Sequence, residues 1–327
     1  MNPLRRELLI RTVALAGGFA GAAAVAHEAW PSKPIRIISP GAAGGGSDIF
    51  VRIVEPRLRE RLGQGLFIEN HPGAGGMTGA AVANSARPDG YTFFVSNVAT
   101  NGIGVSLYRK PTFDPKRDLP AVARIATLSN ALAVKSDRGI NSVADLVAVI
   151  RADPKKAFFG SAGSGTSSHL SSLLFGQRIG VELTHVPYKG TASNLSALLA
   201  GEVLFSMDNL PLYTPHAKAG TLKLLAVTRT SRAANHPDVP TMQEAGIKDF
   251  DISSWYGISA ATGTPQAIID RMGLEIVNAL ADPAVVARIR DIGAEPAALD
   301  PQAYAAFINA EIQKWAALVK SSGAVVD

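Results

Sequence analysis

The sequence contains no cysteine in its 327 residues. Disulfides, thiolate metal sites and cysteine nucleophiles are therefore excluded. Histidine clusters are lacking as well: no His-Glu-x-x-His pattern occurs, and His185, His216 and His236 are scattered along the chain. We therefore expect neither a metal nor a cofactor. A chain of this length can bury a sizeable core without disulfides.

Charge of one sign is also scarce. Charged residues make up 18% of the chain, its formal net charge is +5, and no basic stripe with interleaved aromatic residues is present. Three arginines and one glutamate in residues 1–26 contribute +2, so the remainder carries +3. This excess is too small to predict a nucleic-acid partner.

The apolar run near the amino terminus is too short to span a membrane. Arg5 and Arg6 precede it and Arg11 interrupts it, so residues 12–25 fall short of the ~20 apolar residues that a span needs. Small residues at Ala24-Val25-Ala26 suit signal peptidase. We expect residues 1–26 to be a signal peptide that is cleaved after Ala26, with export to the periplasm. The paired arginines leave both the general secretory and the twin-arginine routes open.

Strands and helices alternate through the rest of the chain, which favours an α/β fold with largely parallel sheets. The predicted strands are 35–38, 66–69, 91–96, 131–135, a run ending at 159, 184–186, 203–207, 222–227 and 252–260. Pro56 lies inside the first helical pattern and predicts a kink or break near residues 52–55. Thr241-Met242-Gln243-Glu244 predicts a short capped helix.

The pattern loosens between residues 108 and 124, where three prolines lie in a charged setting. We take residues 125–130 as the crossing into a second domain, and the strand at 252–260 as the return. The expected first domain is discontinuous, with residues 30–127 and 255–327. The expected second domain is residues 128–254.

Four loops rich in glycine and hydroxyl groups each lie between a strand and the next helix, at 41–48, 71–78, 160–168 and 188–191. Taken singly, each could be an ordinary turn with a spare glycine. In open α/β sheets, however, ligands bind beyond the carboxyl ends of the strands. Backbone N–H groups and helix dipoles at such turns attract anions. If two domains face each other, the four loops line one cleft that suits a small carboxylate.

Several side chains near these loops have two interpretations. Ser47 and Asp48 are expected N-cap residues, and Gly45 could adopt a backbone angle that only glycine accepts. Asp208, at a strand end, either faces the cleft or caps the next turn. Trp255 and Tyr256 either line a hinge or ligand pocket or pack in the core.

Catalytic alternatives have weaker support. The nearest match to a Gly-x-Ser-x-Gly nucleophile elbow, at residues 165–169, lacks the closing glycine. Ser167 and His169 nevertheless leave a periplasmic serine hydrolase as the alternative function. His169 lies near the start of a helix, where a structural or ligand-facing role is commoner than that of a general base. Neither the dinucleotide fingerprint nor a Walker motif is present.

Several motifs resemble those of the Bug family, the extracytoplasmic solute receptors of the tripartite tricarboxylate transporter type. The matching segments are Trp30-Pro31-Ser32-Lys33-Pro34-Ile35, Gly44-Gly45-Gly46-Ser47-Asp48, Glu69-Asn70-His71-Pro72-Gly73-Ala74-Gly75-Gly76, Ala86-Arg87-Pro88-Asp89-Gly90-Tyr91-Thr92, His185-Val186-Pro187-Tyr188-Lys189-Gly190, Pro237-Asp238-Val239-Pro240-Thr241 and the helix start at Thr264-Pro265. The resemblance covers nearly the whole chain after residue 26. It implies a non-catalytic, two-domain periplasmic-binding-protein (Venus-flytrap) fold with a ligand cleft between the domains.

The resemblance also implies a small organic acid as ligand: a mono-, di- or tricarboxylate or an acidic amino acid. First-domain loops would hold a carboxylate through backbone groups and bridging waters, and the glycine-serine loop of the second domain would close over it. We expect a monomer that works with membrane permease subunits of a tripartite transporter or with a sensor. The expected ligand-binding residues are Ala42, Gly44, Gly45, Gly46, Ser47, Asp48, Gly73, Ala74, Gly75, Gly76, Asn97, Ser161, Ser164, Gly165, Thr166, His169, Lys189 and Asp208.

Two departures from the family pattern bear on the ligand. Gly41 and Ala43 stand where relatives usually have phenylalanine and proline, which could enlarge or reshape the site. Leu204 stands where the family usually has an aspartate, which removes a carboxylate.

Overall fold

The computed structural model describes residues 30–109, 113–115, 117–322 and 325. The chain divides into two units, residues 1–32 and 33–327, and the fold and site lie in the second. The predicted signal peptide, residues 1–26, lies outside the described residues. Among the residues that the structure describes, no helix is both long and apolar enough to cross a membrane.

The strands of the second unit form a ten-stranded sheet, in the order β2-β1-β3-β9-β4-β7-β5-β6, with β8 and β10 also paired to β4. The strands β1, β2 and β3 are mutually parallel, as are β7, β5 and β6. Because β4, β8, β9 and β10 pair antiparallel to their neighbours, the sheet is mixed rather than largely parallel. The strands are β1 (Ile35–Ser39), β2 (Leu66–Asn70), β3 (Thr92–Asn97), β4 (Ala121–Lys135), β5 (Phe158–Ser161), β6 (Thr184–Pro187), β7 (Phe205–Asn209), β8 (Leu222–Val227), β9 (Ser253–Ala260) and β10 (Ala294–Leu299).

One long strand joins the two groups of parallel strands. The first part of β4 pairs with β9 and β10, and its last residues, from Asn130, pair with β7 and β8. The strand expected at 131–135 thus begins ten residues earlier, at Ala121. The segment 125–130, expected as a crossing between domains, is therefore ordered β-structure. The division into domains stays a prediction.

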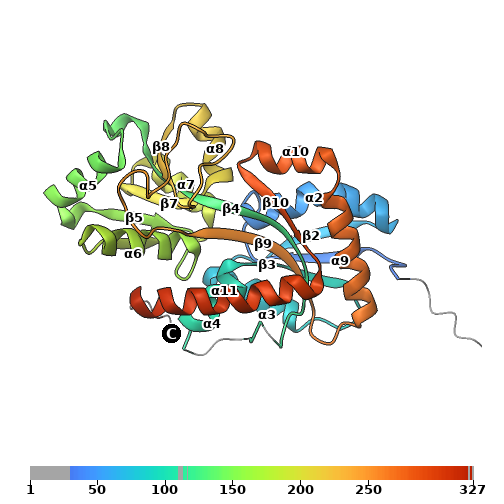
Figure 1. Cartoon of the computed structure of the whole chain (residues 1–327). Coiled ribbons are helices and arrows are strands. Elements are labelled where there is room, and N and C mark those ends of the chain that lie inside the picture. The colour runs from blue at the N-terminus through green and yellow to red at the C-terminus, as the bar shows by residue number, and fades with distance from the viewer. Residues whose placement is uncertain (1–29, 110–112, 116, 323–324, 326–327) are drawn as a thin grey trace, which may run out of the picture. The chain divides into compact units, whose positions relative to one another are not determined.

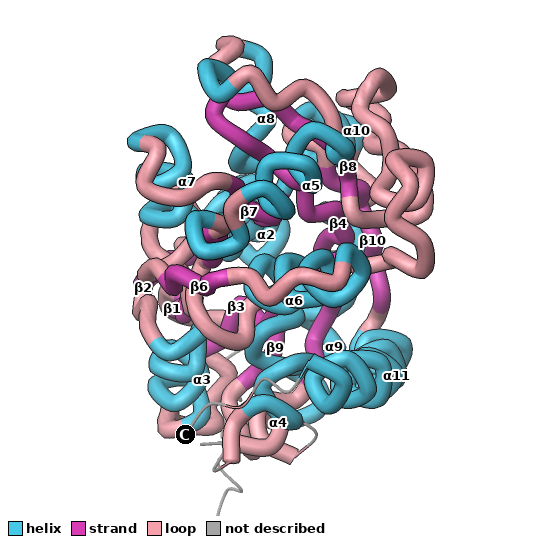
Figure 2. Tube along the Cα trace, turned by 90° about the vertical axis from the view of Figure 1, so that its left-hand side faces the viewer, coloured by secondary structure: helices cyan, strands magenta, loops and turns pink. Residues whose placement is uncertain are grey.

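The helices pack around the strands (Figure 2). They are α2 (Gly46–Leu62), α3 (Met77–Asn84), α4 (Gly104–Leu107), α5 (Val143–Ala152), α6 (Ser167–Ile179), α7 (Thr191–Ala200), α8 (Leu210–Lys218), α9 (Gln266–Leu280), α10 (Pro283–Asp291) and α11 (Pro301–Ser322), with a π-helix, η2 (Ala99–Ile103), and 3₁₀ turns η1 (Ala74–Gly76), η3 (Ser136–Arg138) and η4 (Pro154–Lys156). The last helix, α11, runs beside η2, α4 and β4 (Figure 1).

Most strand predictions agree with the structure, because β-branched and aromatic runs mark the strands well. Three local expectations differ. The helix α2 runs from Gly46 to Leu62 with Pro56 inside it, so the break that was one of the two alternatives near residues 52–55 does not occur. Residues 242–246 are turns rather than a helix, although Thr241 and Glu244 make both hydrogen bonds of a capping box. The strand β10 was not expected, because Ala294–Leu299 contains a proline and little β-branched sequence.

A hydrogen bond from Trp255 anchors the carboxyl-terminal helix to the sheet, and Trp315 on that helix shares the same acceptor. The indole N–H groups of Trp255 on β9 and Trp315 on α11 both donate to Oε2 of Glu311, over 2.8 and 2.9 Å. Both rings are fully buried. Of the two interpretations of Trp255, the core is the one that the structure shows.

Candidate functional site

A cavity of about 450 Å³ lies where the four predicted loops meet. Of the residues expected to bind ligand, the following line it: Ala42, Gly45, Gly46, Ser47, Gly73, Ala74, Gly75, Gly76, Asn97, Ser164, Thr166, Lys189 and Asp208. The others do not line it: Gly44, Asp48, Ser161, Gly165 and His169. Of these five, Asp48, Ser161 and His169 hold the loop backbone in place, because their side chains accept from the N–H groups of Gly44, Gly163 and Gly165.

The loop between β1 and α2 presents the start of a helix to the cavity. Gly45 is the N-cap and has no side-chain cap, so neither Ser47 nor Asp48 is the N-cap as expected. The first intrahelical hydrogen bond runs from Ile49 N to Gly45 O. The N–H groups of Gly46 and Ser47 precede that bond and belong to the first helical turn, which attracts anions.

Asp48 serves this loop from behind. Its carboxylate accepts hydrogen bonds from the Gly44 N–H, from Nε of Arg52 and from Nδ2 of Asn70, over 3.0, 2.8 and 3.2 Å. Burial raises the pKa of Asp48, but the hydrogen bonds from Arg52, Gly44 and Asn70 outweigh that effect and hold the pKa below its ordinary value. Asp48 therefore remains ionised and braces the loop.

The loop between β2 and α3 owes its shape to glycine. Four consecutive residues, Gly73, Ala74, Gly75 and Gly76, have positive φ, and Ala74 adopts this costly conformation at φ 47°. The hydroxyl of Tyr108 donates to the carbonyl of Ala74 over 2.7 Å. That hydrogen bond helps to hold Ala74 in its positive-φ conformation, which alanine rarely adopts.

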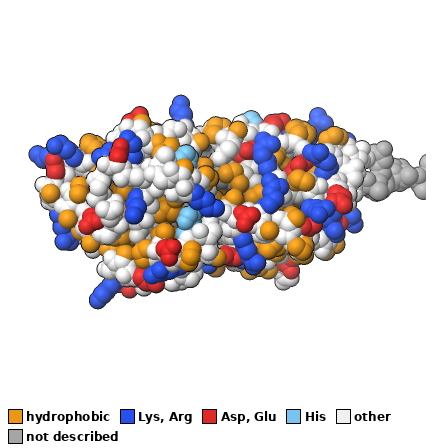
Figure 3. All heavy atoms as spheres, turned by 90° about the horizontal axis from the view of Figure 1, so that it is seen from above, with side chains coloured by type: hydrophobic (Ala, Val, Ile, Leu, Met, Phe, Trp, Pro, Cys, Tyr) orange, Lys and Arg blue, Asp and Glu red, His pale blue; other side chains and the backbone are white. Residues whose placement is uncertain are grey.

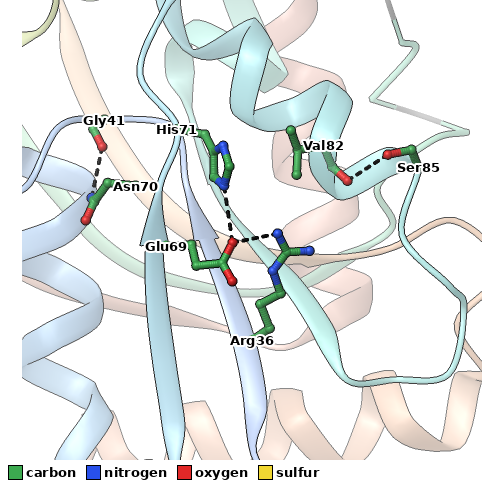
Figure 4. Close-up of polar contacts among 7 residues, drawn as sticks. All are labelled: Arg36, Gly41, Glu69, Asn70, His71, Val82 and Ser85. Carbon is green, nitrogen blue, oxygen red and sulfur yellow. Dashed lines mark hydrogen bonds and ion pairs between the residues drawn. The ribbon is translucent and has the colours of Figure 1, made fainter.

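Polar contacts tie this second loop to the first (Figure 4). Nδ2 of Asn70 donates to the carbonyl of Gly41 over 2.9 Å, and Glu69 is close to both Arg36 and His71. The hydrogen bond from Arg36 is the main reason that the pKa of Glu69 is lowered. Residues 69–71 thus lock the end of β2 against the loop after β1.

The loop between β5 and α6 uses its own hydroxyl groups to hold its shape. Ser168 Oγ accepts from the Ala162 N–H over 2.9 Å, and Thr166 Oγ1 donates to the carbonyl of Gly163 over 2.7 Å. Thr166 is also the N-cap of α6, accepting from the N–H of His169. Ser164, Thr166, Ser167 and Ser168 line the cavity. This loop therefore contributes both hydroxyl groups and a helix amino terminus.

Loops from the two groups of strands approach each other closely. A Cβ added to Gly75 would lie 2.8 Å from the carbonyl oxygen of Ser164. One added to Gly45 would lie 3.3 Å from Oγ1 of Thr191, at the start of α7. The amino termini of α2, α3, α6 and α7 therefore surround one cavity. Such an arrangement favours an anion without an array of cationic side chains.

Charged side chains are few in the cavity. Of the described residues that line it, Lys189 is the one lysine or arginine and Asp208 the one carboxylate. Neutral polar groups supply the rest of the polar lining, among them Tyr256, whose hydroxyl donates to Oδ1 of Asn209 over 2.6 Å. On the face shown in Figure 3, blue and red side chains are interspersed rather than separated into fields of one sign.

Of the two alternatives expected for Asp208, the structure shows the one at the cleft, because the N-cap of α8 is Asn209 and has no side-chain cap. Asp208 lines the cavity, and its Oδ1 accepts from the Asn209 N–H at the start of α8 over 2.8 Å. Its Oδ2 accepts from Nδ2 of Asn194 over 2.7 Å. Burial raises the pKa of Asp208 to about 6, against the lowering effect of these two hydrogen bonds.

His169 and His185 stack behind the glycine-serine loop, with ring centroids 4.0 Å apart. Nδ1 of His169 accepts from the Gly165 N–H over 3.2 Å, and Nε2 of His185 is 2.6 Å from Oγ of Ser161. No hydrogen bond joins Ser167 to His169 among the residues that the structure describes. The two histidines therefore support the loop. Ser167 and His169 lack the nucleophile–base contact of a hydrolase.

This histidine pair predicts acid sensitivity. Burial lowers the pKa of His169 to about 3 and that of His185 to about 4, from an ordinary value of 6.5. The unfolded chain therefore takes up protons first, and stability that is complete above pH 6.5 is lost as the pH falls toward 4. We expect His169→Gln to reduce the loss of unfolding free energy between pH 7 and pH 5 by about 1–2 kcal/mol.

Urea unfolding at both pH values measures this effect. The control is the wild-type chain, unfolded in parallel at the same two pH values. An unchanged pH dependence in His169→Gln would show that His169 is protonated as readily in the folded chain as in the unfolded one.

Several cavity residues were not among the expected ones. They include Tyr108, Asn209 and Ser254, whereas Tyr188 belongs to the expected loop 188–191 and Tyr256 lines the cavity, which was one of its two interpretations. Asn209 directly follows Asp208 at the end of β7, so its place at a strand end was a signal that could have predicted its position in the cavity wall. Tyr108 lies in the irregular stretch after α4, where no motif points to a role. Among the described residues, no group of three or more potential ligands could hold a metal ion.

The chain is similar to a family of known receptors. The family model described as "Tripartite tricarboxylate transporter family receptor" matches residues 50–324. Protein BugT of Bordetella pertussis is 33% identical over 304 residues, which cover 93% of each chain.

Solved structures show the same likeness. R. palustris Rpa4515 with adipate is 34% identical, with a TM-score of 0.88 over 90% of this chain and 99% of that one. MatC (Rpa3494) from Rhodopseudomonas palustris with bound malate is 29% identical, with a TM-score of 0.83 over 89% of this chain and 100% of that one.

Proposed function

Because the chain belongs to the tripartite tricarboxylate transporter receptor family, we propose that it is an extracytoplasmic receptor for a small organic acid, bound in the cavity described above. The family consists of solute-binding receptors, not enzymes, and its fold is the α/β fold of periplasmic binding proteins. The observation that carries the proposal is the convergence of four helix amino termini on a cavity whose lining, among the described residues, has a single cationic side chain. That lining suits an anion held by backbone and hydroxyl donors.

The proposed ligand is a carboxylate, and dicarboxylates are the candidates to test first. Adipate and malate, named for the two similar structures, are both dicarboxylates that differ in length and in a hydroxyl group. Gly41 lines the cavity here, and a Cβ at that position would lie 2.8 Å from Oγ of Ser47. A bulkier residue at position 41 would therefore require Ser47 to move, so glycine there supports a roomier site.

The wider setting of the receptor is part of the same proposal. It is a monomer, exported after cleavage behind Ala26, and it delivers its ligand to permease subunits or to a sensor. Residues 30–127 with 255–327, and residues 128–254, are its two domains, which close on the ligand. Amino-terminal sequencing of the periplasmic protein tests the cleavage. Structures with and without ligand test the domains: a chain that shows no relative movement of the two segments contradicts that division.

A thermal-shift panel tests the binding function. Ligand that binds only the folded state stabilises it by about 2.7 kcal/mol at a hundredfold excess over Kd. At ~2–4 °C per kcal/mol, this raises the melting temperature by several degrees. We expect at least one mono-, di- or tricarboxylate or acidic amino acid to do so, and uncharged amides of the same skeletons to have no effect. If no member of a broad panel shifts the transition, the receptor assignment of this cavity is wrong.

A further inference from the structure

On the premise that the cavity is the carboxylate site, we propose that Asp208 takes up a proton when an anionic ligand binds, and that its neutral carboxyl group then donates a hydrogen bond to the ligand. The proton comes from solvent, and no other bond is made or broken. Asp208 thereby couples ligand affinity to pH.

The position of Asp208 is the first observation. It is the last residue but one of β7, in the interior of the sheet, it is only 1% exposed, and it still forms part of the cavity wall. An ionised carboxyl at that position would repel the anion that the surrounding helix termini attract. Two carboxyl groups confined in one buried site relieve this conflict by retaining a proton.

The partners of Asp208 are the second observation. Each oxygen has one neutral donor, Nδ2 of Asn194 and the N–H of Asn209, and no ion pair of Asp208 occurs among the described residues. Asn194 also donates to Oγ of Ser206, and its own Oδ1 is buried without a partner. Nothing in this arrangement requires the carboxyl to keep its charge.

The groups that face Asp208 leave it as the one that titrates near neutral pH. Tyr213 on α8 and Tyr256 on β9 are buried, and burial raises the pKa of both further above the ordinary tyrosine value. Burial also raises the pKa of Tyr108 and of Tyr188, which line the same cavity. Asn194 and Asn209 do not ionise, and Lys189 is the one cation among the described residues of the wall. His169 and His185, behind the neighbouring loop, are neutral above pH 4 or so because burial lowers their pKa to about 3 and about 4.

Isothermal titration calorimetry tests proton uptake directly. Wild-type protein is titrated with adipate, malate and each panel member that shifts the melting temperature, in buffers that differ in ionisation enthalpy. With a pKa of about 6 in the free protein, uptake at pH 7 should be about 0.9 of a proton per ligand. Simple dicarboxylates are ionised well below this pH, so the ligand itself contributes little.

The affinity should change in step. Between pH 6.5 and 8.5, Kd of the wild type should rise by roughly 50- to 100-fold. In Asp208→Asn, the amide can donate a hydrogen bond without first taking up a proton. Its Kd should therefore change less than about threefold over the same pH range, and this variant should bind more tightly than wild type at pH 8.5. The matched control is Asp238→Asn, an exposed aspartate outside the cavity, which should behave as the wild type.

The outcomes separate the two proposals. If no carboxylate binds wild-type protein, the proposed function fails and this inference fails with it. If a carboxylate binds without proton uptake and with a pH-independent Kd, the receptor function stands and the role of Asp208 is overturned. That role is overturned equally if only ligands with an ammonium or hydroxyl group bind and no proton is taken up, because Asp208 would then be an ionised acceptor. Since the uptake is measured on wild type, the result does not depend on Asp208→Asn folding.

Discussion

Gly45→Val is expected to abolish the ligand-induced rise in melting temperature while leaving the protein folded. Gly45 has φ −78° and ψ 170°, ordinary extended values that valine also adopts, so the variant carries no backbone strain. This corrects the expectation that only glycine fits the backbone there. The effect comes from space: an added Cβ would lie 3.0 Å from the carbonyl of Ala42 and 3.3 Å from Oγ1 of Thr191.

A branched side chain at this position would enter the cavity beside the first N–H groups of α2. It would push the starts of α2 and α7 apart and cover the donors that an anion needs. The wild-type stabilisation of about 2.7 kcal/mol at a hundredfold ligand excess should therefore disappear. The measurement is a melting curve with and without the best ligand of the panel.

The matched control is Gly65→Val. Gly65 also lacks a positive φ, has no atom within 4 Å of the position that a Cβ would take, and lies before β2, outside the cavity. It should retain the full shift. A normal shift in Gly45→Val would place the ligand elsewhere, whereas loss of the shift in both variants would point to a general effect of valine.

Trp255→Ala should give the largest loss of stability. The indole is completely buried, and its ring makes edge contacts with Tyr304 and Phe307, at centroid distances of 5.7 and 5.4 Å. Its N–H is one of the two indole donors to Glu311. Truncation therefore leaves a cavity and removes a hydrogen bond from a buried carboxylate. Together these should lower the unfolding free energy by about 3–5 kcal/mol.

Urea unfolding and thermal melting both measure this loss. At ~2–4 °C per kcal/mol, the melting temperature should fall by roughly 10 °C. Leu274→Ala is the control, because Leu274 is a large apolar residue that is 53% exposed and should change stability by no more than about 0.5 kcal/mol. Equal effects of the two substitutions would mean that the contact of α11 with β9 contributes little to the fold.

Local patterns were enough to identify the loops of the site. The glycines at 44–46, 73–76 and 160–165 follow short β-branched or aromatic runs and precede helical patterns, and each run can be read within about ten residues. Backbone conformation at positions such as Gly73 and Gly75 requires glycine for steric reasons that do not depend on the rest of the chain. The four loops and most of the cavity residues were therefore predictable.

The sequence could not separate residues that face the cavity from those one layer behind it. Asp48 and His169 lie in or next to the loops of the site, but their side chains turn back and accept hydrogen bonds from the N–H groups of Gly44 and Gly165. In a tight turn, a polar side chain that satisfies its own backbone is as favourable as one that awaits a ligand. Only the three-dimensional path of the loop shows which of these occurs.

By itself, the sequence determined the alternation of strands and helices, the glycine-rich strand ends and the absence of thiol chemistry, because these depend on residue type and near neighbours. The tertiary structure decided what depends on distant partners. It paired β4 with four other strands, gave Trp255 the carboxylate of Glu311 on α11, and enclosed Asp208 among Asn194, Asn209 and the cavity. Burial is a property of the assembled fold, and burial is what raises the pKa of Asp208 toward neutrality.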